Sequence, residues 1–318
     1  MYKYLFGPIP SRRLGMSLGV DLVPKKVCSL DCVYCEVGKT TKLSLSRKEY
    51  INSDCIKDEL KHYFENNPAP EFITITASGE PTLNLDLGEI IQFVKQSNPN
   101  VSVAVITNGT LLHDEEVRAA LMYADLLLPS LDAATDEVFK KINRPAENLN
   151  VDDCTQGLIA LCNEFKGKIW LEVFTLPGYN DHESELDELK KIIVQINPDS
   201  IQLNTLDRPG TVPNLRGASR EELQRVVDYW QLNNVEIIAK PKQSEKAQSY
   251  RKDSKSAIIE TISRRPCTID DLIEMLGLNK NEINAHLTSL DSEGQIERVE
   301  EERGIFYQLR NKNGNKSN

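Results

Sequence analysis

The sequence of 318 residues contains no long hydrophobic run, and none of its apolar stretches approaches the roughly 18 residues that suggest a membrane-spanning helix. Its first residues also lack the charged, apolar and small-residue segments of a signal peptide. Seven cysteines are present, but they form no even, regularly spaced set that would indicate a disulfide framework. These absences predict a protein of the reducing cytoplasm that does not span a membrane.

Positive charge is scarce as well. The chain has 38 Lys and Arg against 48 Asp and Glu, which gives a formal net charge of −10. A protein with this surplus of acid does not attract polyanions through its bulk charge. The length is sufficient for one large domain with a sizeable core and for a small additional unit.

What the sequence does contain is a group of cysteines between Val27 and Val37. Cys28, Cys32 and Cys35 follow a C-x3-C-x2-C pattern, so their thiolates can converge on one face of a tight loop. Such a loop suits three corners of a cubane [4Fe–4S] cluster, whose ligands are normally cysteine sulfurs, and it leaves the fourth iron open. A structural zinc site needs four ligands, and no Cys or His stands nearby to complete one. A zinc site with a distant fourth ligand and three unrelated thiols remain the alternatives.

With Tyr34 in its aromatic position, this motif resembles the signature of the radical S-adenosylmethionine (SAM) superfamily. The stretch from Gly7 to Gly15 (GPIPSRRLG) is similar to the opening of a subgroup described as like the wyosine-type, tRNA-modifying radical SAM proteins. The resemblance extends over roughly residues 1–240. It implies a [4Fe–4S] cluster that binds SAM at its open iron and cleaves it to a 5′-deoxyadenosyl radical, which abstracts hydrogen from a substrate. It also implies an electron donor such as ferredoxin or flavodoxin.

Short apolar runs alternate with helical patterns over most of the chain, which predicts an α/β fold of parallel β/α units. Periodicity alone does not separate a doubly wound sheet from a barrel, whereas the resemblance implies an open, partial (β/α)6 barrel. Either arrangement places the functional groups at the carboxyl ends of the strands. The six expected strands are Met16–Val23, Phe72–Ala77, Val101–Thr107, Asp125–Leu131, Ile169–Leu176 and Ser200–Leu206, with helices between them that include Arg47–Phe64, and Val235–Ala239 is a candidate for one more.

The turn after the second expected strand reads Ser78-Gly79-Glu80-Pro81 and resembles the G-G-E motif of the family, with Ser in the first position. There, the strand edge and Glu80 would receive the ammonium group of SAM in a charge-assisted contact. Glycine allows a ligand to approach the backbone closely. An ordinary polar turn is the alternative interpretation.

Polar residues also follow the next two expected strands. Asn108 and Ser130 are the candidates for holding the methionine carboxylate or the ribose of SAM, because the family uses polar groups at these strand ends. Asp132 is expected instead to cap the helix that follows it. The predicted cofactor-binding set therefore comprises Tyr34, Ser78, Gly79, Glu80, Asn108 and Ser130.

Three residues are candidates for contact with the substrate. Glu172 lies within the fifth expected strand, where a charged side chain faces either the barrel interior or a salt bridge. Asn204 has the corresponding place in the sixth strand, and Arg208 follows that strand. Arg12 and Arg13 precede the first strand and could hold an anion, although a structural ion pair is the simpler expectation.

The composition changes after residue 238, where the expected barrel domain (1–238) ends. Residues 239–255 carry six Lys or Arg against two acids and few apolar residues, which predicts a linker or a basic flap beside the barrel mouth. Residues 256–310 contain three short helical patterns, with a capping box at Thr268 and Asp271, and then a hairpin. This order resembles a winged helix-turn-helix domain, followed by a flexible tail at 311–318.

The charge of this second domain argues against DNA binding. Residues 254–318 carry nine Lys or Arg against eleven Asp or Glu, and three consecutive glutamates lie in the wing. Because phosphate contacts supply most non-specific DNA affinity, a basic face is expected of a DNA-binding module. We therefore expect the domain to dock a protein, a peptide or the barrel itself.

Two classes of function follow. The first is a radical SAM enzyme whose substrate (a tRNA base, a peptide or a small molecule) the sequence does not identify. The second is an iron–sulfur or zinc-dependent regulator, in which the cysteine loop is the sensor and the winged helix is the output. Cleavage of SAM under reducing conditions separates the two.

Overall fold

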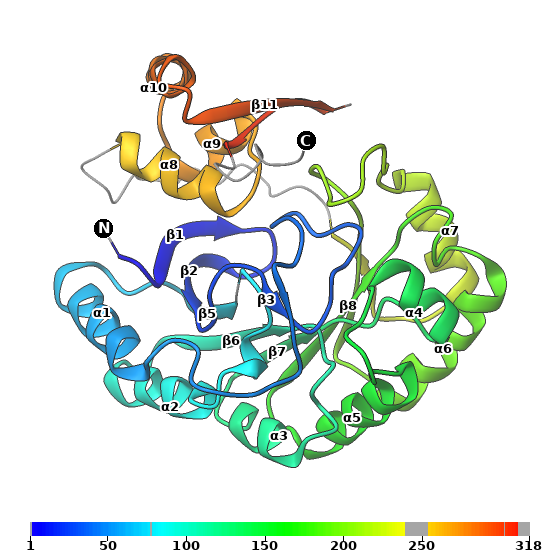
Figure 1. Ribbon diagram of the computed structural model, residues 1–318. Helices are drawn as coiled ribbons and strands as arrows, with labels where there is room; N and C mark the ends of the chain where they lie inside the picture. Colours follow the sequence, from blue (N-terminus) through cyan, green and yellow to red (C-terminus); the bar gives the residue numbers. More distant parts are fainter. Residues whose placement is uncertain (1, 77, 239–253, 302, 311–318) are drawn as a thin grey trace.

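The computed structural model describes residues 2–76, 78–238, 254–301 and 303–310 (Figure 1). Most of its strands form one sheet in the order β1-β2-β5-β6-β7-β8-β9-β10. Six of these are parallel and follow one another in sequence, which confirms the predicted β/α units: β2 (Gly15–Asp21), β5 (Phe72–Thr76), β6 (Ser102–Thr107), β7 (Leu126–Pro129), β8 (Lys168–Phe174) and β9 (Ser200–Asn204).

The sheet curves into an open arc with helices along its outer side, as expected of a partial barrel (Figure 1). These helices are α1 (Ser53–Asn66), α2 (Leu87–Ser97), α3 (Glu115–Leu121), α4 (Asp136–Ile142), α5 (Val151–Glu164), α6 (Glu183–Ile196) and α7 (Arg220–Trp230). The expected helix over Arg47–Phe64 begins later than predicted. Asn52 caps α1 by accepting a hydrogen bond from Asp54 N at 3.0 Å, and Arg47 pairs instead with Asp114 near the start of α3.

The two ends of the sheet carry an additional strand each. β10 (Val235–Ile237) pairs parallel to β9, close to where the sequence suggested a strand. β1 (Leu5–Ser11) pairs antiparallel to β2 and was not predicted, because its glycine and two prolines disfavour a strand. An edge position tolerates proline, since one side of such a strand needs no ladder partner. A Cβ on Gly19 of β2 would lie 1.9 Å from the Phe6 ring, so glycine makes room for β1 to pack.

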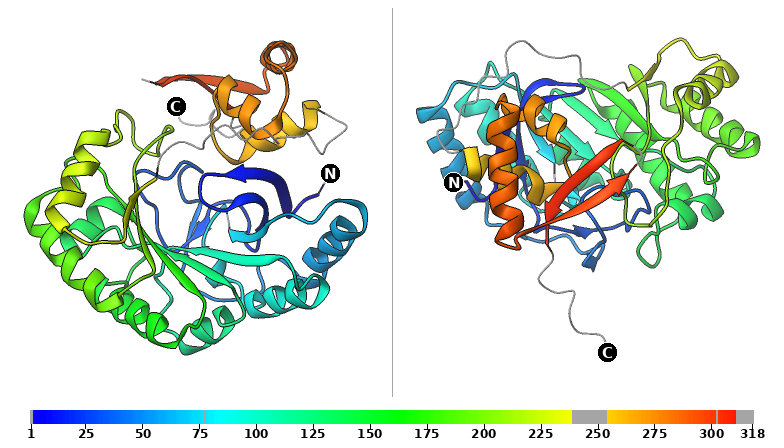
Figure 2. Two further views of the ribbon diagram at one scale, coloured as in Figure 1. Left: turned by 180° about the vertical axis from the view of Figure 1, so that it is seen from behind. Right: turned by 90° about the horizontal axis from the view of Figure 1, so that it is seen from above.

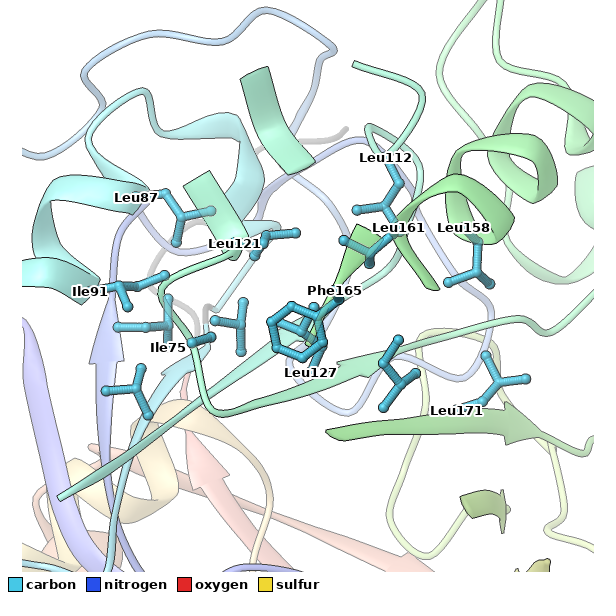
Figure 3. Packing of buried hydrophobic residues seen from close by; sticks show 14 of the residues in the cluster. Ile75, Leu87, Ile91, Leu112, Leu121, Leu127, Leu158, Leu161, Phe165 and Leu171 are labelled. Atoms are coloured by element: carbon cyan, nitrogen blue, oxygen red, sulfur yellow. The ribbon is translucent and has the colours of Figure 1, made fainter. Parts of the chain in front are cut away.

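The outer face of the sheet is buried under the helices (Figure 3). Fully burying one such aliphatic side chain stabilises the fold by about 1.5–3 kcal/mol, so this layer holds the strands and the loops at their carboxyl ends in place. The packed residues include Leu87 and Ile91 of α2, Leu121 of α3, Leu158 and Leu161 of α5, and Ile75, Leu127 and Leu171 of the strands.

The C-terminal domain consists of α8 (Ser254–Arg264), α9 (Ile269–Leu276), α10 (Lys280–Ser292) and a hairpin of β11 (Ile296–Glu301) and β12 (Gly304–Leu309). This confirms the predicted winged-helix order. The capping box is present: Thr268 Oγ1 accepts from Asp271 N at 3.1 Å, and the Asp271 carboxylate accepts from Thr268 N at 3.0 Å. Helix α8 begins two residues before the expected boundary, while the rest of the expected linker and the expected tail lie outside the described residues.

The winged-helix domain lies on the open side of the arc, beside β1 (Figures 1 and 2). The Arg264 guanidinium stacks over the Phe6 ring at 3.9 Å. The winged-helix domain therefore docks on the barrel, which is one of the three roles expected for it. Within the described residues, three ion pairs join the two parts, namely Arg264–Asp21, Arg303–Asp207 at 3.0 Å and Arg208–Asp271 at 3.6 Å. Among the described residues, no helix has both the length and the apolar character needed to traverse a bilayer.

Candidate functional site

The cysteine loop follows β2, at the carboxyl end of the parallel strands. It begins in a short strand, β3 (Val27–Cys28), which pairs with β4 (Lys42–Leu43). Cys35 N donates to Cys32 O at 3.2 Å, so the chain turns back between the last two cysteines. All three thiols are free and half-buried.

Each thiol faces a side-chain nitrogen donor. Lys26 Nζ lies 3.1 Å from Cys35 Sγ, Asn143 Nδ2 lies 3.4 Å from Cys32 Sγ, and Asn108 Nδ2 lies 3.5 Å from Cys28 Sγ. Burial raises the pKa of Cys28 to about 12, and burial also raises the pKa of Cys32 well above its ordinary value. The free thiols of Cys28 and Cys32 therefore keep their protons, so a metal has to displace them. Donors aimed at sulfur then stabilise the resulting thiolates.

A single metal ion and a cubane cluster would need different arrangements of the three thiols. In the part of the chain that the structure describes, no three His, Cys, Asp or Glu side chains converge closely enough to hold one metal ion. Zinc requires its sulfur ligands within about 2.3 Å of a common centre, whereas a cubane cluster holds each cysteine on a separate iron. The described residues therefore offer no closed zinc site.

The Ser78-Gly79-Glu80 turn packs directly against this loop. Lys26 N donates to Ser78 O at 2.5 Å, and Glu80 N donates to Val27 O at 3.0 Å. A Cβ on Gly79 would lie 1.9 Å from Val27 O, so only glycine allows the two segments to approach this closely. The contact brings together the two motifs that the sequence suggested for the cofactors.

The Glu80 carboxylate is buried and links the ends of β5 and β6. Its Oε1 accepts from Thr82 N at 3.1 Å, Thr82 Oγ1 at 2.6 Å and Thr107 Oγ1 at 2.7 Å. Its Oε2 accepts from Asn108 N at 2.7 Å, which is the one hydrogen bond to this oxygen from the described residues. Burial raises the pKa of Glu80. Glu80 therefore has a structural role, and its Oε2 retains acceptor capacity for a ligand.

Asn108 and Ser130 both lie at strand ends, as expected. The Asn108 amide donates to Ser29 Oγ at 2.9 Å as well as facing Cys28. Ser130 is held through its backbone, with its N–H donating to Thr107 O at 3.0 Å and a bridge to Glu172. Asn108 is thus the one of the pair that contacts the cysteine loop directly.

The Tyr34 side chain is held by Asp132, for which the sequence predicted another role. Its ring stacks on Phe174 with centroids 3.8 Å apart, and its hydroxyl donates to Asp132. The prediction that Asp132 caps a helix was wrong, because Thr135 caps α4. Asp132 also accepts from Asn143 Nδ2 at 2.8 Å, and burial raises the pKa of Asp132 to about 6. It anchors the cysteine loop to the strand ends through contacts that local sequence patterns do not reveal.

The three substrate-contact candidates have separate partners. Glu172 forms an ion pair with Arg13, so the ion pair expected for Arg13 is present. Asn204 is buried, and its Oδ1 accepts from the N–H of the next residue at 3.0 Å. Arg208 is also buried and pairs with Glu36 at 3.2 Å, in addition to its pairing with the winged helix.

Two cavities open beside these residues. One, of about 270 Å³, lies inside the arc and is closed by α9 and the turn before it, which contribute Arg265, Asp271 and Met275. The other, of about 1250 Å³, lies between the cysteine loop, residues 209–215 and the winged helix. Both are lined by Ser78 and Glu36. The sequence did not predict that winged-helix residues line the cavity. The consecutive arginines Arg264 and Arg265 were the one local feature that could have indicated it.

A match to a family model identifies the superfamily of the chain. Residues 22–189, more than half of the chain, match the model of the radical SAM superfamily. The chain belongs to this superfamily. Residues 240–301 match the model of the DprA winged helix domain, in agreement with the second domain. The protein is thus a radical SAM enzyme, of a family whose cofactors are SAM and a [4Fe–4S] cluster.

Several curated relatives match over most of the chain. The chain is 38% identical over 289 residues to a protein named GTPase Obg from Brachyspira hyodysenteriae, which covers 91% of this chain but only 42% of that protein. It is 28% identical over 309 residues to the UPF0026 protein MJ1312 of Methanocaldococcus jannaschii, covering 95% and 94% of the two chains. A UPF0026 protein of Helicobacter pylori strain 26695 is 31% identical over 297 residues, covering 92% and 93%.

Solved structures show the same fold. A radical SAM methyltransferase from Sphaerobacter thermophilus superposes with a TM-score of 0.53 at 14% identity, covering 72% of this chain and 67% of that one. Streptococcus suis SuiB bound to S-adenosylmethionine gives a TM-score of 0.50 at 14% identity, covering 69% and 50%. The similarity to the wyosine-type subgroup stays a prediction.

Proposed function

We propose that this radical SAM enzyme holds a [4Fe–4S] cluster on Cys28, Cys32 and Cys35 and cleaves SAM reductively to begin hydrogen abstraction on a substrate. The observation that carries the proposal is the direct contact of the cysteine loop with the turn of Gly79 and Glu80. When bound and reduced by a donor such as ferredoxin or flavodoxin, the cluster supplies the electron that splits the sulfonium of SAM.

The residues of the chain position the reactants. Tyr34, stacked on Phe174, holds the loop against the strand ends, while Lys26 and Asn108 direct their nitrogens at the cysteine sulfurs. Glu80 Oε2 is available to accept the SAM ammonium. Ser78 lies on the wall of both cavities, so a substrate in either of them is next to this region.

The enzyme and regulator hypotheses differ in SAM turnover. We expect the anaerobically reconstituted protein to convert SAM to 5′-deoxyadenosine and methionine when dithionite is added, because the loop presents three cysteines for a cluster with one open iron. Chromatography of the quenched mixture quantifies both products. A protein that carries the cluster but forms no 5′-deoxyadenosine would favour the regulator.

Glu80→Gln tests the ammonium contact. The substitution keeps the shape of the side chain and removes its charge, so SAM affinity should fall by about 1.5–3 kcal/mol, or ten- to a hundredfold, as for a lost charge-assisted hydrogen bond. Equilibrium dialysis of SAM against the reconstituted protein measures the change. Cluster content should be unaltered.

Thr107→Val is the matched control for this experiment. It removes one hydrogen bond to Glu80 Oε1 but leaves the carboxylate charged. We expect it to lower the melting temperature while preserving SAM affinity. Equal losses of SAM affinity in both variants would assign Glu80 a structural role alone.

A further inference from the structure

The smaller cavity is rich in arginine although the whole chain has a net charge of −10. Six arginines and five carboxylates line it. The arginines come from both domains: three from the barrel, in the turn between β1 and β2 and the loop after β9, and three from the winged helix. They are Arg12, Arg13, Arg208, Arg264, Arg265 and Arg303.

Four of these guanidiniums have carboxylate partners. Arg13 pairs with Glu172 and Arg264 with Asp21, so each of these pairs is neutral. The other two, Arg208 and Arg303, share acids where the barrel meets the winged helix, an interface called the seam from here on. Their ion pairs are Arg208–Glu36 at 3.2 Å, Arg208–Asp271 at 3.6 Å, Arg303–Asp271 at 2.5 Å and Arg303–Asp207 at 3.0 Å.

Arg12 and Arg265 have no such partner. Across the described residues, neither guanidinium forms an ion pair, and that of Arg265 donates weakly to Met275 Sδ at 3.8 Å. Burial, together with the neighbouring Arg208 guanidinium, lowers the pKa of Arg265. Both side chains are half-buried. A guanidinium carries five N–H donors and stays charged, so leaving it unpaired in such a place is unfavourable.

The unpaired arginines, Arg12 and Arg265, both act on the Glu36 carboxylate. Burial opposes ionisation of Glu36, but the guanidiniums of Arg208, Arg265 and Arg12 outweigh it and hold the pKa of Glu36 below its ordinary value. Three guanidiniums therefore act on one carboxylate, and two of them, Arg12 and Arg265, form no ion pair among the described residues. These two are available to an anionic ligand.

We propose that Arg12 and Arg265 bind the phosphate group of a phosphorylated substrate in this cavity. A phosphate monoester carries a charge of about −1.5 to −2 at pH 7, and planar guanidiniums match its oxygens in bidentate pairs. The phosphate group offers three acceptor oxygens to the two guanidiniums, whereas a single carboxylate offers two. The winged helix supplies one of the two arginines, which makes it part of the substrate site.

The position of the cavity fits this substrate class. Ser78, at the proposed SAM site, lines the same cavity, so a molecule anchored by its phosphate would direct its other end toward the SAM side. This orientation rests on the proposed function, whereas the phosphate site itself does not. The wider cavity shares Glu36 and Arg265 with the smaller one and has room for the remainder of a larger substrate.

Calorimetric titration of the full-length, reconstituted protein with inorganic phosphate tests the site before any SAM is added. We expect Arg12→Gln and Arg265→Gln each to weaken phosphate binding at least tenfold. Arg225→Gln is the matched control, because this arginine lies on α7 outside the cavity with 76% of its side chain exposed. It should bind phosphate as the unaltered protein does.

Thermal unfolding of the same proteins separates binding from folding. Without phosphate, Arg265→Gln should melt no lower than the unaltered protein, since it removes a half-buried charge that has no ion-pair partner among the described residues. The rise in melting temperature that phosphate causes should disappear in this variant. A large loss of stability without phosphate would mean that Arg265 serves the fold, and would overturn its assignment.

Malonate, a dianion with two carboxylates, tests whether the site prefers phosphate to a carboxylate dianion. Weaker binding of malonate than of phosphate is expected. Malonate binding as tight as that of phosphate would overturn the phosphate assignment, and unchanged phosphate affinity in both arginine variants would overturn the site. SAM cleavage by the same preparation is scored separately, so a failure of the proposed function is seen independently of these results.

Discussion

Replacing Cys28, Cys32 and Cys35 together by Ala is expected to abolish iron binding while leaving the protein folded. The reconstituted protein should hold about four irons per chain, because the three thiolates are the cysteine ligands of a cubane cluster. The variant should hold essentially none. Its fold should persist because backbone hydrogen bonds fix the loop, including Val33 N to Ile142 O at 2.9 Å. Iron analysis and the visible absorbance of the cluster measure the outcome.

A second triple variant provides the control. Cys55, Cys154 and Cys162 lie outside the motif, and Cys154 donates weakly to Thr110 O at 3.9 Å. Replacing these three by Ala removes the same number of thiols and should leave the iron content unchanged. Iron that persists in the first variant, or one zinc per chain in the unaltered protein, would contradict the assignment.

Arg208→Met should destabilise the protein by about 3–5 kcal/mol, the usual effect of removing one partner from a buried ion pair. Only 6% of the Arg208 side chain is exposed, and its partners Glu36 and Asp271 are 18% and 9% exposed. Without the guanidinium, the charge on Glu36 is left in a poorly hydrated place. The free energy of unfolding in a denaturant titration reports the change.

The same substitution at an exposed ion pair provides the comparison. Arg216 pairs with Glu222 at 2.7 Å, and 59% of its side chain is exposed. Arg216→Met should cost less than about 1 kcal/mol, because exposed pairs contribute little. If Arg208→Met costs no more than Arg216→Met, the ion pairs at the seam do not stabilise the fold. Adding Glu36→Gln to Arg208→Met should restore part of the loss.

The features that could be predicted from sequence are those that depend on neighbouring residues. Spacing alone brought Cys28, Cys32 and Cys35 together, and the capping box at Thr268 marked the start of a winged-helix element. β1 was missed because its own residues disfavour a strand and only its pairing with β2 stabilises it. Local preference is a weak guide where tertiary contacts decide.

The remaining contacts of the site depend on which elements pack together. The hydroxyl of Tyr34 meets Asp132 across 98 positions of sequence, and Arg264 meets Asp21 across 243. No periodicity or motif encodes such pairs. For the same reason, the presence of Arg12 and Arg265 in one cavity could not be predicted, since it depends on the winged helix docking beside β1.

The seam between the barrel and the winged helix is made largely of charges. The apolar core of the winged helix runs from Ile258 to Leu309, and it shares no residue with that of the barrel, which ends at Ile237. Separating the two parts therefore divides no common hydrophobic core, and water can solvate the charges that are released. Polar interfaces of this kind between domains favour relative movement. Salt, which screens such charges over about 8 Å at physiological strength, should therefore weaken the contact between the barrel and the winged helix and ease access to the cavity between them.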